Sequence, residues 1–127
     1  MIALTRFGAQ VVSLCMLGAV AAGCTMGVNP ASPGYQALTS HNFAAARADF
    51  AEAYTKNPHD PFVELDLAAA YQNLGRMDLA EPFYRGVIAD GKGIMPETTM
   101  LASDSGLTLD QIACKNLRMG LGANARC

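Results

Sequence analysis

Few side chains in this sequence have the type and spacing that catalysis or metal binding requires. The two histidines, His41 and His59, have no cysteine, histidine or carboxylate at the spacing of metal ligands. Glu64 and Asp66 are two positions apart on a predicted helix, so they point to different faces and cannot act as an acid and base pair. The stretch 91–93 lacks the length and the hydroxyl residue of a phosphate-binding loop. We therefore expect no catalytic residue, no metal and no cofactor.

Four cysteines carry the remaining reactive chemistry. Cys114 and Cys127 lie near the end of the chain, where an oxidising compartment would let them form a disulfide. The loop so closed has about 14 residues, for which loop-closure entropy gives about 3 kcal/mol of stabilisation. The alternative is a half-buried thiol on a helix and a second thiol on a frayed terminus. The sequence favours the disulfide.

Residues 1–23 have the pattern of a secretory leader, in which one cation, Arg6, precedes apolar and small residues. Their strongly apolar part, 11–20, is shorter than the roughly 20 residues of a permanent membrane helix, which favours a cleaved leader. Residues 24–34, which are rich in proline and glycine, are then expected to form a flexible tether.

The end of this leader, Ala21-Ala22-Gly23-Cys24, resembles the lipobox of bacterial lipoproteins, although Ala21 stands where leucine is commoner. The resemblance implies a lipid on Cys24. Because Thr25 rather than an aspartate follows, it also implies an outer-membrane location facing the periplasm. The alternative is ordinary cleavage after 20–22, which leaves Cys24 as a free thiol.

The composition indicates one small helical domain. The chain has 127 residues, a net charge of −2 and no tryptophan, and only 7% of its residues are aromatic. Abundant alanine favours close-packed helices over strands. The absence of a basic cluster argues against nucleic-acid binding.

A repeat organises the middle of the chain. A shift of 34 residues places small residues over small and aromatic over aromatic: Ala46 over Ala80, Phe50 over Tyr84, Ala53 over Val87. This pattern, and the segment 61–91 above all, resembles the tetratricopeptide repeat. The resemblance implies an all-α, short α-solenoid of antiparallel helix pairs over residues 35–91. The first repeat is expected to be truncated, because Pro30 and Pro33 exclude a regular start to its first helix; the second is complete.

Two repeats need a further element to cover their apolar face. Residues 92–127 are expected to supply a loop and a C-terminal capping helix from Leu109 to Met119. Thr108 and Gln111 have capping-box spacing, and Gly120 suits the end of the helix.

The resemblance also implies a groove lined by the first helix of each repeat, which in this family binds proteins or peptides. The groove-facing candidates are Phe62, Leu65, Asp66, Ala69, Gln72 and Asn73. The alternative is a solvated face without a ligand. The carboxylate-clamp subtype is not implied, since Leu65 and Ala69 stand where that clamp has polar groups.

These features favour a non-enzymatic adaptor, anchored in the membrane through lipid, for a protein or peptide partner of a cell-envelope assembly. The second hypothesis is a structural envelope protein that forms homo-oligomers by stacking its short array on another copy. The reason for this second hypothesis is that the incomplete first helix is expected to leave an apolar edge uncovered.

Overall fold

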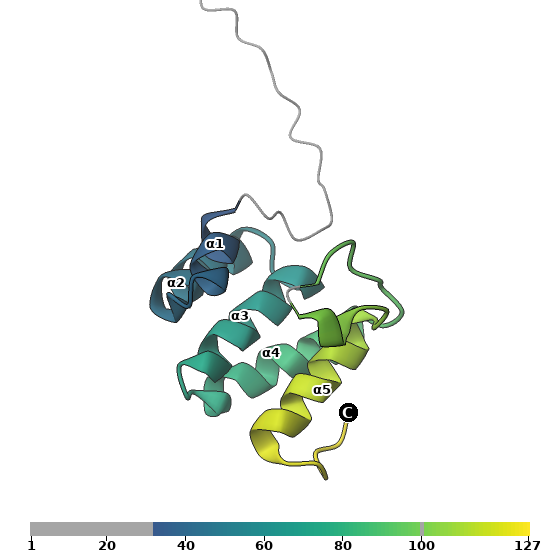
Figure 1. Ribbon diagram of the computed structural model, residues 1–127. Helices are drawn as coiled ribbons and strands as arrows, with labels where there is room; N and C mark the ends of the chain where they lie inside the picture. Colours follow the sequence, from purple (N-terminus) through teal and green to yellow (C-terminus); the bar gives the residue numbers. More distant parts are fainter. Residues whose placement is uncertain (1–31, 100) are drawn as a thin grey trace, which may run out of the picture.

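The computed structural model describes residues 32–99 and 101–127. Cys24, the leader and most of the expected tether lie outside these ranges. The described residues form helices and no strand: α1 (Pro33–Thr39), α2 (Phe43–Lys56), α3 (Pro61–Asn73), α4 (Met77–Asp90), the 3-10 helix η1 (Ala102–Asp104) and α5 (Leu109–Leu121). Consecutive α-helices pack on one another (Figure 1), which confirms the all-α, repeat-like fold. In these ranges no helix is long and apolar enough to cross a bilayer.

The helix starts follow from local side-chain chemistry. The Asp60 carboxylate accepts a hydrogen bond from the Phe62 N–H at 3.0 Å, and Pro61 occupies the first turn, where its missing N–H costs nothing. The Asn42 side chain caps α2 in the same way, by accepting from the Ala45 N–H at 3.3 Å. Helices α2 and α3 therefore begin at polar caps encoded in the sequence.

The start of α1 corrects the sequence analysis. Pro33 does not exclude a regular start; it is at the first position of the helix, and Ser32 caps it by accepting from the Tyr35 N–H at 3.2 Å. The tether predicted to reach residue 34 is therefore wrong for its last two residues. Gly34 is buried, and a Cβ added there would lie 2.9 Å from the Phe50 ring, so the absence of a side chain lets α1 approach α2. The first helix of the first repeat is nevertheless short: α1 has 7 residues, whereas α3, its counterpart in the second repeat, has 13.

The repeat residues form the core. Ala46 and Ala80 are fully buried at equivalent places in α2 and α4, with Phe50 and Tyr84 beside them. One apolar cluster joins α1, α2 and α3, and a second joins α3, α4 and α5. The small residues allow close helix approach and the aromatic residues fill the space beside them.

Helix α5 covers the apolar face of the second repeat. Its residues Leu109, Ala113 and Leu117 are fully buried, and the Thr108 N–H donates to the Gln111 side chain at 3.0 Å at its start. The prediction that Gly120 ends this helix is wrong. The helix continues to Leu121 and ends at Gly122, whose φ of 107° favours glycine.

Gly120 has a different role. It lies inside α5, where a Cβ would overlap the Met77 Sδ at the start of α4. Its lack of a side chain therefore serves helix packing, not helix termination.

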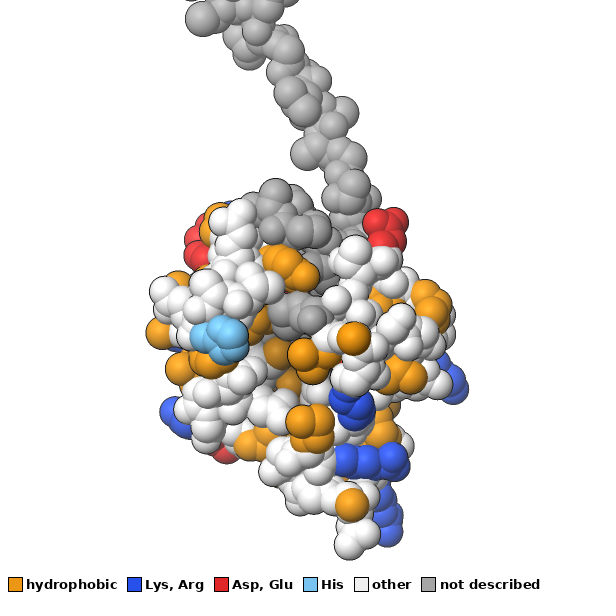
Figure 2. All heavy atoms as spheres, viewed as in Figure 1, with side chains coloured by type: hydrophobic (Ala, Val, Ile, Leu, Met, Phe, Trp, Pro, Cys, Tyr) orange, Lys and Arg blue, Asp and Glu red, His pale blue; other side chains and the backbone are white. Residues whose placement is uncertain are grey.

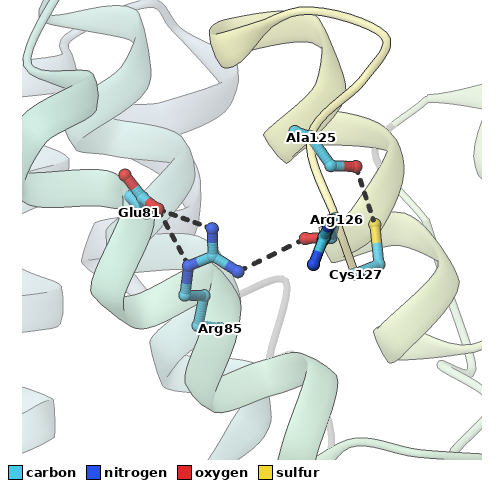
Figure 3. A network of polar contacts seen from close by, with 5 residues as sticks. All are labelled: Glu81, Arg85, Ala125, Arg126 and Cys127. Carbon is cyan, nitrogen blue, oxygen red and sulfur yellow. Dashed lines mark hydrogen bonds and ion pairs between the residues drawn. The ribbon is translucent and has the colours of Figure 1, made fainter.

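The C-terminal tail folds back along α5. Cys127 forms a disulfide with Cys114, with the two Cα atoms 5.5 Å apart. Arg118 Nε donates to the Ala125 carbonyl at 3.3 Å, and Arg85 Nη1 on α4 donates to the Arg126 carbonyl at 3.3 Å. Figure 3 shows Arg85 held at the same time by Glu81, so the tail joins α4 to α5.

Reduction of this disulfide is expected to lower the thermal midpoint by about 15 °C, since a loop of this length contributes about 3 kcal/mol. Thermal unfolding with and without reductant measures the shift. A Cys114→Ser/Cys127→Ser variant is the control, because its midpoint should not respond to reductant. Free labelling of both thiols in the native oxidised protein would contradict the bridge.

Candidate functional site

A groove of about 440 Å³ opens on one face of the molecule. Its walls come mainly from α1, α3, α5 and the described residues of segment 96–104, which are 96–99 and 101–104. In Figure 2 hydrophobic side chains gather in a hollow on this face. The apolar lining residues include Leu38 from α1, Leu65 from α3, and Leu109 and Ile112 from α5. Such a lining, with a few polar groups among it, is typical of a binding site.

Five of the six candidate residues line the groove: Leu65, Asp66, Ala69, Gln72 and Asn73. They lie three and four positions apart along α3, so they share one face of the helix.

Phe62 is placed elsewhere, and its assignment to the groove is wrong. It is 8% exposed and belongs to the core cluster formed by α3, α4 and α5. Sequence periodicity alone did not reveal that this core would enclose the first turn of α3.

The segment 96–104 forms a wall that the sequence analysis did not assign. The Lys115 ammonium on α5 forms an ion pair with the buried carboxylate of Asp104 and donates to Ser103 Oγ at 3.0 Å. The Leu109 N–H donates to the Ile94 carbonyl at 2.8 Å. The Lys115 contacts fix this segment against α5, and the Ile94 contact fixes the chain just before it. The only sequence signal for such a wall was the length of the loop.

A chain of hydrogen bonds crosses the floor of the groove. The Tyr84 hydroxyl on α4 donates to Gln72 Oε1 at 2.5 Å, and Gln72 Nε2 donates to the Asn116 carbonyl on α5 at 3.3 Å. Burial raises the pKa of Tyr84, which keeps the phenol protonated and able to donate. The side chain of Gln72 is thereby held in one orientation, and three helices are joined beneath the groove.

Asp66 differs from Asp104, the other acid that lines the groove. It is 7% exposed, and its carboxyl has no hydrogen-bond or ion-pair partner among the described residues. Burial, with a smaller contribution from the Asp60 charge, raises the pKa of Asp66 to about 7. Asp104, the other acid in the groove, has Lys115 as its partner. Asp66 is therefore an acid that the fold buries without giving it a cationic or hydrogen-bonding partner.

The histidines lie at turns. His41 and His59 both have positive φ, 62° and 68°, and both are exposed. His59 Nδ1 is 3.8 Å from an Asp90 carboxylate oxygen at the surface. Within the part of the chain that the structure describes, no group of three or more His, Cys, Asp or Glu could hold a metal ion.

Stacked helix pairs with a groove along the first helices define a helical-repeat protein. Residues 37–93 match the family model described as Tetratricopeptide repeat. The match runs from within α1 to just beyond α4. Comparisons with curated proteins and with solved structures gave no significant match. The repeat suggests a protein–protein interaction adaptor.

The raised pKa of Asp66 predicts a stability that falls with pH. Its pKa is 3.8 in an ordinary environment and about 7 in the fold, so between these values the folded state binds more protons than the unfolded state. The contribution of Asp66 to stability is therefore greatest below pH 4 and declines as the pH rises to 7. Asp66→Asn, which is neutral throughout, should be more stable than the native protein at pH 8 by about 2 to 4 kcal/mol.

Urea unfolding at pH 5 and pH 8 measures this difference. Part of the decline should persist in the variant, because burial also raises the pKa of Glu64. Asp49→Asn, on the exposed surface of α2, is the matched control and should follow the native protein. If the unfolding free energies of Asp66→Asn and the native protein changed equally with pH, the Asp66 carboxyl would not be buried away from solvent.

Proposed function

We propose that this protein is a non-enzymatic adaptor whose groove holds an extended segment of a partner protein. The observation that carries the proposal is the groove itself: a cavity walled by α1, α3, α5 and segment 96–104, with apolar residues and a few polar groups on one face. Tetratricopeptide repeats are typically non-enzymatic scaffolds, and Asp66 has no nucleophile or base at hydrogen-bond distance in the described residues.

The form of the groove supports an extended ligand. Leu65 and Ala69 offer an apolar strip along α3, and the volume of about 440 Å³ accommodates a few side chains. Asn73 Nδ2 donates to the Ala69 carbonyl at 2.8 Å, which leaves its side-chain oxygen able to accept a hydrogen bond from a partner backbone. Apolar contacts would then give affinity, and the polar groups would fix the register of the segment.

We further propose that the adaptor works in the bacterial cell envelope, anchored in the outer membrane by lipid on Cys24 and facing the periplasm. The leader pattern of 1–23 and the lipobox-like Ala21–Cys24 support this. The disulfide of Cys114 and Cys127 is in keeping with an oxidising compartment such as the periplasm.

A second candidate function is self-assembly. None of the exposed large hydrophobic side chains in the described ranges belongs to α1, although Leu101 lines the groove beside that helix. Leu74 and Leu79 flank the turn between α3 and α4, and Met119 and Leu121 end α5. These two segments adjoin where Gly120 meets Met77. An exposed apolar end of this kind could stack on a second copy.

Site-specific photocrosslinking in intact cells tests both candidates. A photoreactive residue at Asn73, or at Thr39 on the opposite wall, should crosslink to a different protein. Ala48, which is exposed on α2 and does not line the groove, is the control position and should give no such product. Crosslinks to a second copy would favour self-assembly. Equal products from Ala48 and Asn73 would contradict a groove-specific partner.

Cys24→Ala tests the anchor. Without an acylated cysteine the exported chain should move from the membrane fraction to the soluble periplasmic fraction, because its helices in the described ranges are not suited to span a bilayer. Fractionation followed by immunoblotting measures the distribution. A variant whose leader is removed and which stays fully in the membrane would refute lipid anchoring.

A further inference from the structure

Asp66 imposes a cost on the fold that no contact within the described residues offsets. A carboxyl that is buried without a partner is destabilising relative to an apolar residue in the same place. Leu65 and Ala69 flank it on the same face of α3, so an alanine or leucine would complete an apolar wall. Residues that break the rules of stability inside a groove are candidates for ligand contact.

The charges around Asp66 favour a cation. Asp60 caps the same helix, and Asp104 lies across the groove in η1. Tyr84 on α4 is uncharged. The described residues that line the groove include neither lysine nor arginine, and the Lys115 ammonium is already paired with Asp104. An incoming cation would therefore meet negative or neutral groups, and its strongest interaction would be with the unpaired carboxyl.

The apolar lining selects among cations. Leu38 and Ile112, both largely buried, and the exposed Leu101 border the groove, which suits an unbranched aliphatic stem. Gln72 Oε1 already accepts the Tyr84 hydroxyl, so acceptors for the five N–H groups of a guanidinium are few. A primary ammonium has three N–H donors and so needs fewer hydrogen-bond acceptors, most of which one carboxylate supplies.

We propose that the groove receives a lysine side chain of the partner segment, whose ammonium pairs with Asp66 while its stem packs on the leucine and isoleucine side chains of the groove. This proposal rests on the proposed function, since it names the residue that the groove recognises. Binding would supply the counter-ion that the fold itself does not give to Asp66, and it would make partners with an apolar or acidic residue at this point bind more weakly.

The test uses small probes of the same chemistry. n-Hexylammonium, 1-hexanol and hexanoate are titrated separately into the exported, oxidised protein at pH 8, and amide shifts are followed by ¹⁵N-correlated NMR. n-Hexylammonium should bind at least about 5-fold more tightly than 1-hexanol, which corresponds to about 1 kcal/mol. The shifts should centre on Leu65, Asp66 and Ala69, and hexanoate should bind most weakly.

Asp66→Asn is the matched variant. It should lose the preference for the ammonium over the alcohol while the remainder of its spectrum stays native-like. Asp49→Asn, on the outer surface of α2, should retain the preference. Equal binding of n-hexylammonium and 1-hexanol to the native protein, no binding of either, or an unchanged preference in Asp66→Asn would each overturn the lysine proposal. Persistent crosslinks from Asn73 would then leave the adaptor proposal standing.

Discussion

The packing of α5 against α3 and α4 is the contact on which the rest of the structure depends. A tetratricopeptide unit buries its apolar face only against a neighbour, and this chain has one full repeat and one with a short first helix. Leu109, Ile112 and Leu117 of α5 stand in for the missing neighbour by covering Ala80, Tyr84 and Val87. The same helix supplies a wall of the groove. The stability of the repeats and the shape of the groove thus both depend on this one helix.

Polar contacts hold that helix in place from several sides. Gln72 links the Tyr84 hydroxyl to the α5 backbone beneath the groove, and Lys115 holds the η1 segment through Asp104. On the far side, the disulfide and the Arg85 contact fasten the tail. A groove held in this way loses little conformational freedom when a ligand enters, which favours affinity.

Two buried acids on α3 show how the fold assigns different roles to similar residues. Glu64 faces α4, where a Cβ at Gly86 would come within 2.7 Å of its carboxylate, so the glycine makes room for it. Asp66, two positions on, lines the groove. Sequence spacing predicted that the two side chains point to different faces of the helix, and they do. Their burial depends on α4 and α5, which local periodicity does not describe.

Local and repeating features of the fold could be predicted from the sequence, whereas contacts between distant elements could not. The 34-residue spacing, the Asp60 cap and the Thr108–Gln111 box are local or repeating signals, and the helices follow them. Phe62 and Gly120 were misassigned because their roles arise from contacts with distant helices. The wall at 96–104 depends on an ion pair between residues 11 positions apart in different elements, for which the loop sequence gave no motif.

Asp66 is a buried, unpaired acid in the groove that α5 helps to form. A carbon-13 NMR titration that follows the Asp66 side-chain carboxyl of the native protein tests this directly. We expect a midpoint of about 7, because burial disfavours the charged form. A midpoint near 3.8, the ordinary value for an aspartate, would show a solvated or neutralised carboxyl and would contradict the account.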